Sequence, residues 1–122
     1  MGDMTKHFSR SEFACKCGCG SRLVWLELLQ ALEKIREWAG APVSIVSGVR
    51  CKKHNAAVNG AIRSRHLTGE AADIRVAGKT PEEVVEFCIK NWPDKYGVGY
   101  YPVSGFVHID IRTSRARWEQ VR

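Results

Sequence analysis

The stretch that decides the fold is Ser64–Asp73, which reads SRHLTGEAAD, together with the later segment Val107–Asp110, which reads VHID. The first segment places one histidine and one aspartate on either side of a glycine, and the second adds another of each. Two imidazoles and one carboxylate that converge can form a zinc site with one position left open. Because an open position is typical of a catalytic zinc ion, the two segments predict a zinc hydrolase.

The local structure expected around these residues favours convergence. Phe106–Ile111 is expected to be a strand, and residues two apart on a strand point to one face, so His108 and Asp110 share a face. His66 is expected in a loop, since a threonine and a glycine follow it closely, and Asp73 at the head of the next strand. Neutral imidazole and carboxylate both suit zinc, which lowers the pKa of bound water to about 7 and so supplies a hydroxide nucleophile.

The remaining elements predict an α+β fold rather than a doubly wound α/β fold. Apolar residues recur every three to four positions in Leu23–Ala39, which indicates an amphipathic helix. A threonine cap, a proline and a glutamate start a second helix that runs from Thr80 to about Asn91. Short helical turns are expected at Ser9–Glu12 and Lys52–Val58. Strands are expected at Val43–Val49, Asp73–Val76, Tyr96–Tyr101 and Phe106–Ile111, so that a small antiparallel sheet packs against the helices.

The length of 122 residues indicates one compact domain spanning residues 1–122, with a cysteine-rich segment at residues 1–22. No apolar run approaches the roughly 20 residues that a membrane-spanning helix needs. Residues 1–10 are polar and lack the apolar core of a signal peptide. The chain is therefore expected in the cytoplasm, or outside the cell by a route without a cleaved signal, and is expected to be a monomer.

The net charge of +6 favours anionic partners, either nucleic acid or an anionic cell-wall polymer. A surface excess that serves only solubility is an equally good explanation. The basic residues are dispersed, without a long Lys/Arg run or an aromatic-interleaved motif, so no nucleic-acid partner is expected.

Five cysteines leave three interpretations open. Cys15, Cys17, Cys19 and Cys51 could form a disulfide with free thiols, remain reduced, or bind a second, structural metal ion. Their CxCxC spacing is tighter than the usual zinc spacing, which makes the second ion the least favoured interpretation. Cys88 is expected to be a small buried residue of the second helix.

The quoted motif resembles the signature of the zinc D-Ala-D-Ala carboxypeptidases, which share a fold with hedgehog signalling domains. Ser47–Asn55 is similar to that family's segment before the first ligand. Gly97–Pro102 and Phe106–Asp110 resemble its last hairpin, particularly in small phage and bacterial members. The resemblance covers roughly Phe8–Trp118 and implies a hedgehog/DD-peptidase-like fold.

The resemblance also implies an activity and a set of site residues. The activity is that of a zinc peptidase on the peptide stems of bacterial peptidoglycan, as a D,D-carboxypeptidase or an endopeptidase. His66, Asp73 and His108 carry over as ligands of one zinc ion. Arg50 carries over as the arginine that polarises the scissile carbonyl or holds a carboxylate, and Ser64 as a hydrogen-bonding residue beside the site. From the residues alone, a surface salt bridge at Arg50 and a capping hydroxyl at Ser64 are the alternatives.

One position departs from the family pattern. Several members carry a catalytic acid three residues before the last histidine, where this chain has Gly105. Asp110, on the His108 face, is the remaining candidate for the general base, and the alternative is that it accepts the other ring N–H of a ligand histidine. Tyr100 is a weaker candidate for contact with substrate, against a role in filling the core.

Two hypotheses about the function follow. The first is a phage or prophage enzyme, endolysin-like or virion-associated, that acts on the cell wall. The second is a catalytically weak or inactive zinc-binding module of the same fold, which recognises the cell wall or a partner.

Overall fold

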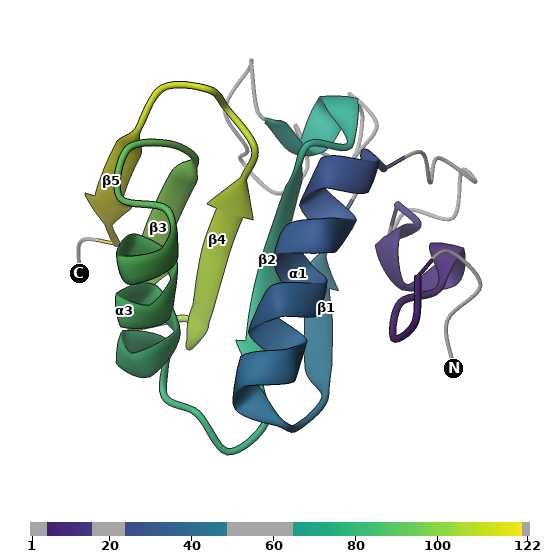
Figure 1. The fold of residues 1–122 in the computed structure, drawn as a ribbon, viewed down its shortest axis with the longest axis horizontal. Helices are drawn as coiled ribbons and strands as arrows, with labels where there is room; N and C mark the ends of the chain where they lie inside the picture. The colour runs from purple at the N-terminus through teal and green to yellow at the C-terminus, as the bar shows by residue number, and fades with distance from the viewer. Residues whose placement is uncertain (1–4, 16–23, 49–64, 121–122) are drawn as a thin grey trace.

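The computed structural model describes residues 5–15, 24–48 and 65–120, and these contain one mixed sheet (Figure 1). Its strands are β1 (Val43–Ser47), β2 (Ala71–Val76), β3 (Gly97–Tyr101), β4 (Phe106–Asp110) and β5 (Ala116–Glu119). They lie in the order β1-β2-β4-β3-β5, and every neighbouring pair is antiparallel except β3 and β5, which are parallel. The predicted α+β class is confirmed, and the parallel fifth strand makes the sheet mixed.

Helix α1 (Leu26–Ala39) lies against β1 and β2 (Figure 1). Its apolar residues recur at helical spacing and form one buried stripe that faces the sheet. The buried members are Leu28, Leu29, Ala31, Leu32 and Ile35. Gly40 ends the helix in the left-handed conformation at a φ of 63°, which a residue without a Cβ adopts at little cost.

Helix α3 (Pro81–Asn91) covers the same sheet face beside α1, over β3 and β4 (Figure 1). The Thr80 hydroxyl accepts a hydrogen bond from the Glu83 N–H at 3.2 Å, and the Glu83 carboxylate accepts one from the Thr80 N–H at 3.0 Å. The predicted capping box is therefore confirmed, and it sets the first turn of the helix.

Several boundaries differ from the expected ones by a few residues. The first helix begins at Leu26 instead of Leu23, and β1 ends at Ser47 instead of Val49. Strand β2 begins two residues before Asp73, so the aspartate lies inside the strand and not at its head. Strand β5 was not expected at all, and the helical turn expected at Lys52–Val58 lies outside the described residues.

Strand alternation divides the sheet into an apolar and a polar face. The apolar face packs against the helices and contains Ala72, Ile74, Val76, Val107 and Ile109. The opposite face carries the buried polar side chains Asp73, His108 and Asp110. The same alternation thus builds the core and separates it from a second, polar cluster.

The N-terminal segment packs beside β1. The predicted turn at Ser9–Glu12 is confirmed as a short 3₁₀ helix, η1 (Arg10–Phe13). The rings of Phe8, just before it, and of Phe13, at its end, are fully buried. A Cβ on Gly48 would lie 2.7 Å from the Phe13 Cα, so only glycine fits here without a shift of the segment. Gly48 follows β1 directly. The N-terminal segment therefore packs, through Phe13, against the end of this strand.

Cys88 is fully buried in α3, as predicted, and burial raises the pKa of its thiol to about 12. Cys15 is also buried. The other three cysteines of the proposed cluster lie outside the described residues, so its three interpretations stay open. Within the described ranges, no helix combines the length and the apolar composition needed to span a membrane.

Candidate metal centre

One row of paired residues crosses the whole sheet on its polar face. The register pairs Ser47 with Asp73, Asp73 with His108, His108 with Gly99, and Gly99 with Trp118. Directly paired residues have side chains on the same face, a few ångströms apart. The fold therefore brings Asp73 and His108 side by side, although they are 35 residues apart in the chain.

His66 reaches this row from outside the sheet. It lies in the 3₁₀ helix η2 (Arg65–Thr68), and not in an irregular loop, and Gly69 follows the helix at a φ of 73°. The His66 ring is buried, and its Nδ1 lies 2.7 Å from the Gly48 carbonyl oxygen. A carbonyl oxygen only accepts, so Nδ1 carries a proton, and Nε2 faces the Asp73 Oδ1 at 3.3 Å.

The two histidines meet at one carboxylate oxygen. His108 Nδ1 lies 2.9 Å from the same Asp73 Oδ1, and the two imidazole rings stand edge to face with centroids 5.1 Å apart. One ligand atom from each of the three residues lies within 4.8 Å of the others. All three side chains are buried. The predicted ligands therefore converge on one point below the surface.

The chemistry of this donor set fits a divalent cation. Each ring nitrogen that faces Asp73 needs either an added proton or a cation between itself and the carboxylate, because a lone pair and an anionic oxygen repel. A metal ion placed among the three atoms would replace both protons. Two imidazoles and one carboxylate are a ligand set that zinc accepts.

The titration of the cluster reflects the same geometry. Burial opposes ionisation of Asp73, but hydrogen bonds from His108 and His66 outweigh it and hold the pKa of Asp73 well below its usual range. Burial also opposes charge on His108, yet hydrogen bonds to Asp110 and Asp73 raise the pKa of the ring. Asp73 is therefore an anion at neutral pH, as a metal ligand has to be.

Asp110 is completely buried and accepts hydrogen bonds from several donors. Its Oδ2 lies 2.9 Å from the His108 Nε2, and its two oxygens receive the Arg112 Nε and Nη2, each at 2.7 Å. Burial opposes ionisation of Asp110, but the hydrogen bonds from His108 and Arg112 outweigh it and lower the pKa of Asp110 below its usual range. His108 and Arg112 therefore hold Asp110 as an anion, and its role as general base stays a prediction.

A model of the family described as Peptidase M15 matches residues 6–110, which include all three clustered residues. The chain belongs to the Peptidase M15 family. This is the family of zinc D-Ala-D-Ala carboxypeptidases, so the resemblance drawn from the motif is confirmed. Searches of curated proteins and of solved structures returned no match. The α+β architecture agrees with the hedgehog-like fold of the family.

The other predicted site residues of this M15 peptidase fall in different places. Tyr100 pairs with Val107 in the β3–β4 register and so lies on the helix-facing side of the sheet, away from His108. The structure therefore does not bring Tyr100 to the metal cluster. Arg50 and Ser64 lie outside the described residues, and their roles stay predictions.

Four residues of the site were not singled out from the sequence: Gly97, Gly99, Arg112 and Trp118. A Cβ on Gly97 would collide with the Asp110 carboxylate, and one on Gly99 would lie 2.5 Å from the Trp118 indole nitrogen. Two glycines at a spacing of two in a strand are a signal of close approach on one face, and that signal was present in the sequence. Trp118 had no signal, because no strand was expected around it.

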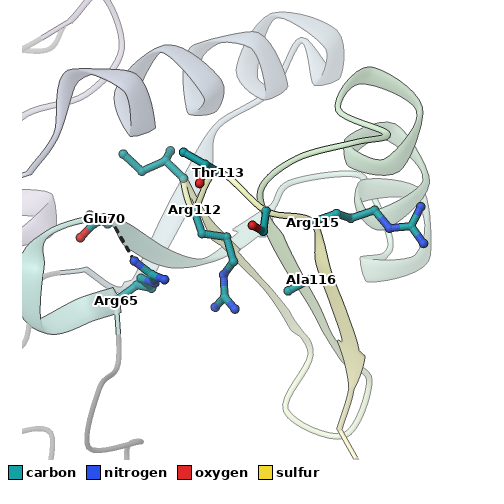
Figure 2. Close-up of a pocket in the computed structure, with 8 residues that line it drawn as sticks. Arg65, Glu70, Arg112, Thr113, Arg115 and Ala116 are labelled. Atoms are coloured by element: carbon teal, nitrogen blue, oxygen red, sulfur yellow. Dashed lines mark ion pairs between the residues drawn. The ribbon is translucent and has the colours of Figure 1, made fainter.

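A cavity of about 330 Å³ is lined in part by Arg112, the residue that binds the Asp110 carboxylate (Figure 2). Residues that line it include Arg65, Glu70, Arg112, Ser114 and Arg115. Arg65 Nη1 lies 3.5 Å from Glu70 Oε2, and the Arg112 side chain extends beside this pair. The peptidase thus has a predominantly basic hollow next to the residues that surround His108.

Proposed function

We propose that this M15 peptidase is a zinc enzyme that hydrolyses amide bonds in the peptide stems of peptidoglycan, as a D,D-carboxypeptidase or an endopeptidase. The observation that carries the proposal is the buried group of His66, Asp73 and His108, within a chain that matches the family over residues 6–110. The basic cavity beside Arg112 supports it, because peptide stems carry carboxylates and guanidinium groups bind carboxylates well.

In this mechanism, the ion would be held by His66, Asp73 and His108. Zinc bound there supplies a Lewis acid and lowers the pKa of water to about 7. Asp73 provides the negative charge that offsets the cation, and the Gly48 carbonyl orients the His66 ring from behind. Burial of all three side chains keeps bulk water from competing for them.

In this proposal, Arg50 holds or polarises the substrate carbonyl. Ser64 is a hydrogen-bonding residue beside the site. The proposed setting is the bacterial cell wall, reached from a phage or prophage during lysis or from a virion. The net charge of +6 supports this setting, since a basic protein is attracted to an anionic polymer.

Mass analysis of muropeptides tests the proposal. Purified peptidoglycan is digested with the zinc-loaded protein. We expect products in which one stem or cross-bridge amide has been hydrolysed, and the masses of these products identify the bond. A chelator should stop the reaction and added zinc should restore it. His66→Ala, checked for folding by its melting curve, should release no product. Equal digestion by this variant would refute a zinc mechanism at this site.

A wall-binding module of the same fold is the second candidate. Strand β4 contains one acidic residue, Asp110, and Arg112 and His108 enclose it, while Gly105 stands where several relatives carry an acid. This candidate predicts that the zinc-loaded protein sediments with insoluble peptidoglycan and releases no soluble muropeptide. Release of defined fragments would exclude it.

A further inference from the structure

We propose that Asp110, Arg112 and Trp118 are positioning residues that hold the His108 imidazole with its proton on Nε2 and its Nδ1 turned toward the metal position. The inference rests on the metal site of the proposed function and is independent of the substrate. It assigns Asp110 to the orientation of a ligand and not to proton transfer at the reacting bond.

The Asp110 carboxylate has no accepting capacity to spare. Oδ1 accepts hydrogen bonds from the Gly97 N–H at 3.1 Å, the Arg112 N–H at 3.1 Å and the Arg112 Nε–H at 2.7 Å. Oδ2 accepts from the Arg112 Nη2 at 2.7 Å and faces the His108 Nε2 at 2.9 Å. Two carboxylate oxygens offer about four lone-pair sites, so these five donors saturate the group and fix its orientation.

The saturated carboxylate decides which nitrogen of His108 carries the proton. An ionised carboxylate only accepts, so the His108 Nε2 facing it has to donate. In a neutral ring the lone pair is then on Nδ1, which lies 2.9 Å from Asp73. The two histidines consequently present opposite nitrogens to the metal position, Nε2 from His66 and Nδ1 from His108.

The imidazole ring also separates Asp110 from the reacting atoms. Nδ1 and Nε2 lie on opposite sides of the ring, and Asp110 meets the Nε2 side while the metal position lies on the Nδ1 side. A general base has to reach the proton that it removes, directly or through one water. Asp110 is therefore placed to orient His108 from behind.

Trp118 supports the same ring from β5, across the intervening strand β3. Its indole lies against His108 with ring centroids 5.0 Å apart, and the Arg112 guanidinium carbon lies 5.2 Å from the indole centroid. The indole N–H donates to the Tyr101 hydroxyl at 2.9 Å, which fixes its rotation. Gly99, between His108 and Trp118 in the row, has no side chain to keep them apart.

Imidazole NMR of the wild-type protein with one equivalent of zinc tests the proposal without any substitution. Long-range ¹H–¹⁵N spectra report which nitrogen of each histidine is protonated and which binds the metal. We expect His108 to carry its proton on Nε2 and His66 on Nδ1. A His108 ring protonated on Nδ1, or bound to zinc through Nε2, would overturn the proposal.

Zinc affinity, measured by competition with a chelator, tests the individual residues. Loss of an orienting partner weakens metal binding by about 10- to 100-fold, and we expect Asp110→Ala in this range. Arg112→Ala should weaken binding several-fold, whereas Arg115→Ala, on the same loop but outside these contacts, should leave it unchanged. Equal affinity of the two arginine variants would remove Arg112 from the group, even if Asp110→Ala fails to fold.

These measurements distinguish failure of this inference from failure of the proposed function. Neither the NMR nor the zinc-affinity measurement uses peptidoglycan. Zinc bound to His108 in the other tautomer would therefore overturn only the assignment of Asp110, Arg112 and Trp118 as positioning residues. Correct tautomers without muropeptide cleavage would overturn only the peptidase proposal.

Discussion

At the scale of single residues, Gly97 shows how a missing side chain makes room for a charged one. A methyl group at this position would occupy the space of the Asp110 carboxylate, to which the Gly97 N–H donates. We expect Gly97→Ala to destabilise the protein by about 1–3 kcal/mol, as other overpacked sites do, and to weaken zinc binding. Urea unfolding measures the first effect, with the exposed strand substitution Ser44→Ala as the control. An unchanged midpoint for Gly97→Ala would contradict this packing.

The three candidate metal ligands could be predicted from the sequence, because strand period and motif spacing both act over short distances. The period of two placed His108 and Asp110 on one face, and the structure agrees. Arg112 and Trp118 could not be predicted as partners of His108. The Trp118 contact depends on cross-strand register, which brings together residues that no local pattern relates. Arg112 lies only two residues beyond Asp110, but the strand period does not show that its guanidinium turns back onto that carboxylate.

At the scale of elements, the Thr80 capping box is the clearest local determinant of a helix. The hydroxyl of Thr80 satisfies a backbone N–H that the first turn of α3 otherwise leaves without a helical partner. We expect Thr80→Ala to lower the free energy of unfolding by about 0.5–2 kcal/mol, since it removes that acceptor. Thr80→Ser keeps the hydroxyl and should stay close to wild type. Thermal unfolding of the two variants measures this difference. Equal losses of stability in both variants would argue against the cap.

The helices and four of the strands were predictable, since each has its own apolar period or its own caps. Strand β5 was not predicted, because Ala116–Glu119 is only four residues long and only partly buried, although apolar and charged residues alternate along it. It forms a strand because it pairs in parallel with β3, beyond the hairpin. Its place in the fold comes from tertiary pairing, which sequence periodicity does not record.

At the scale of the whole molecule, Glu33 of α1 ties the N-terminal segment to the helical layer. Burial raises its pKa, but hydrogen bonds from the Thr5 hydroxyl and from His7 outweigh this and lower it. A lowered carboxyl pKa contributes stability above the unfolded-state value of about 4.3, and this contribution is lost as pH falls through the folded-state value.

Glu33→Gln should therefore be less stable than wild type at pH 7, and the difference should shrink below about pH 4. Urea unfolding across this range provides the measurement. Glu37→Gln, on the exposed side of the same helix, is the matched control and should follow the wild type throughout. A gap between Glu33→Gln and wild type that is constant with pH would show that the carboxylate charge is not what anchors the segment.

The central claim is that one metal ion binds at His66, Asp73 and His108 and not at the cysteines. X-ray absorption of the protein loaded with one equivalent of zinc tests this most directly, because sulfur and lighter ligands lie at different distances. We expect only nitrogen and oxygen neighbours of the zinc, at about 2.0–2.2 Å. A shell of sulfur at about 2.3 Å would place the zinc on cysteine and contradict the account.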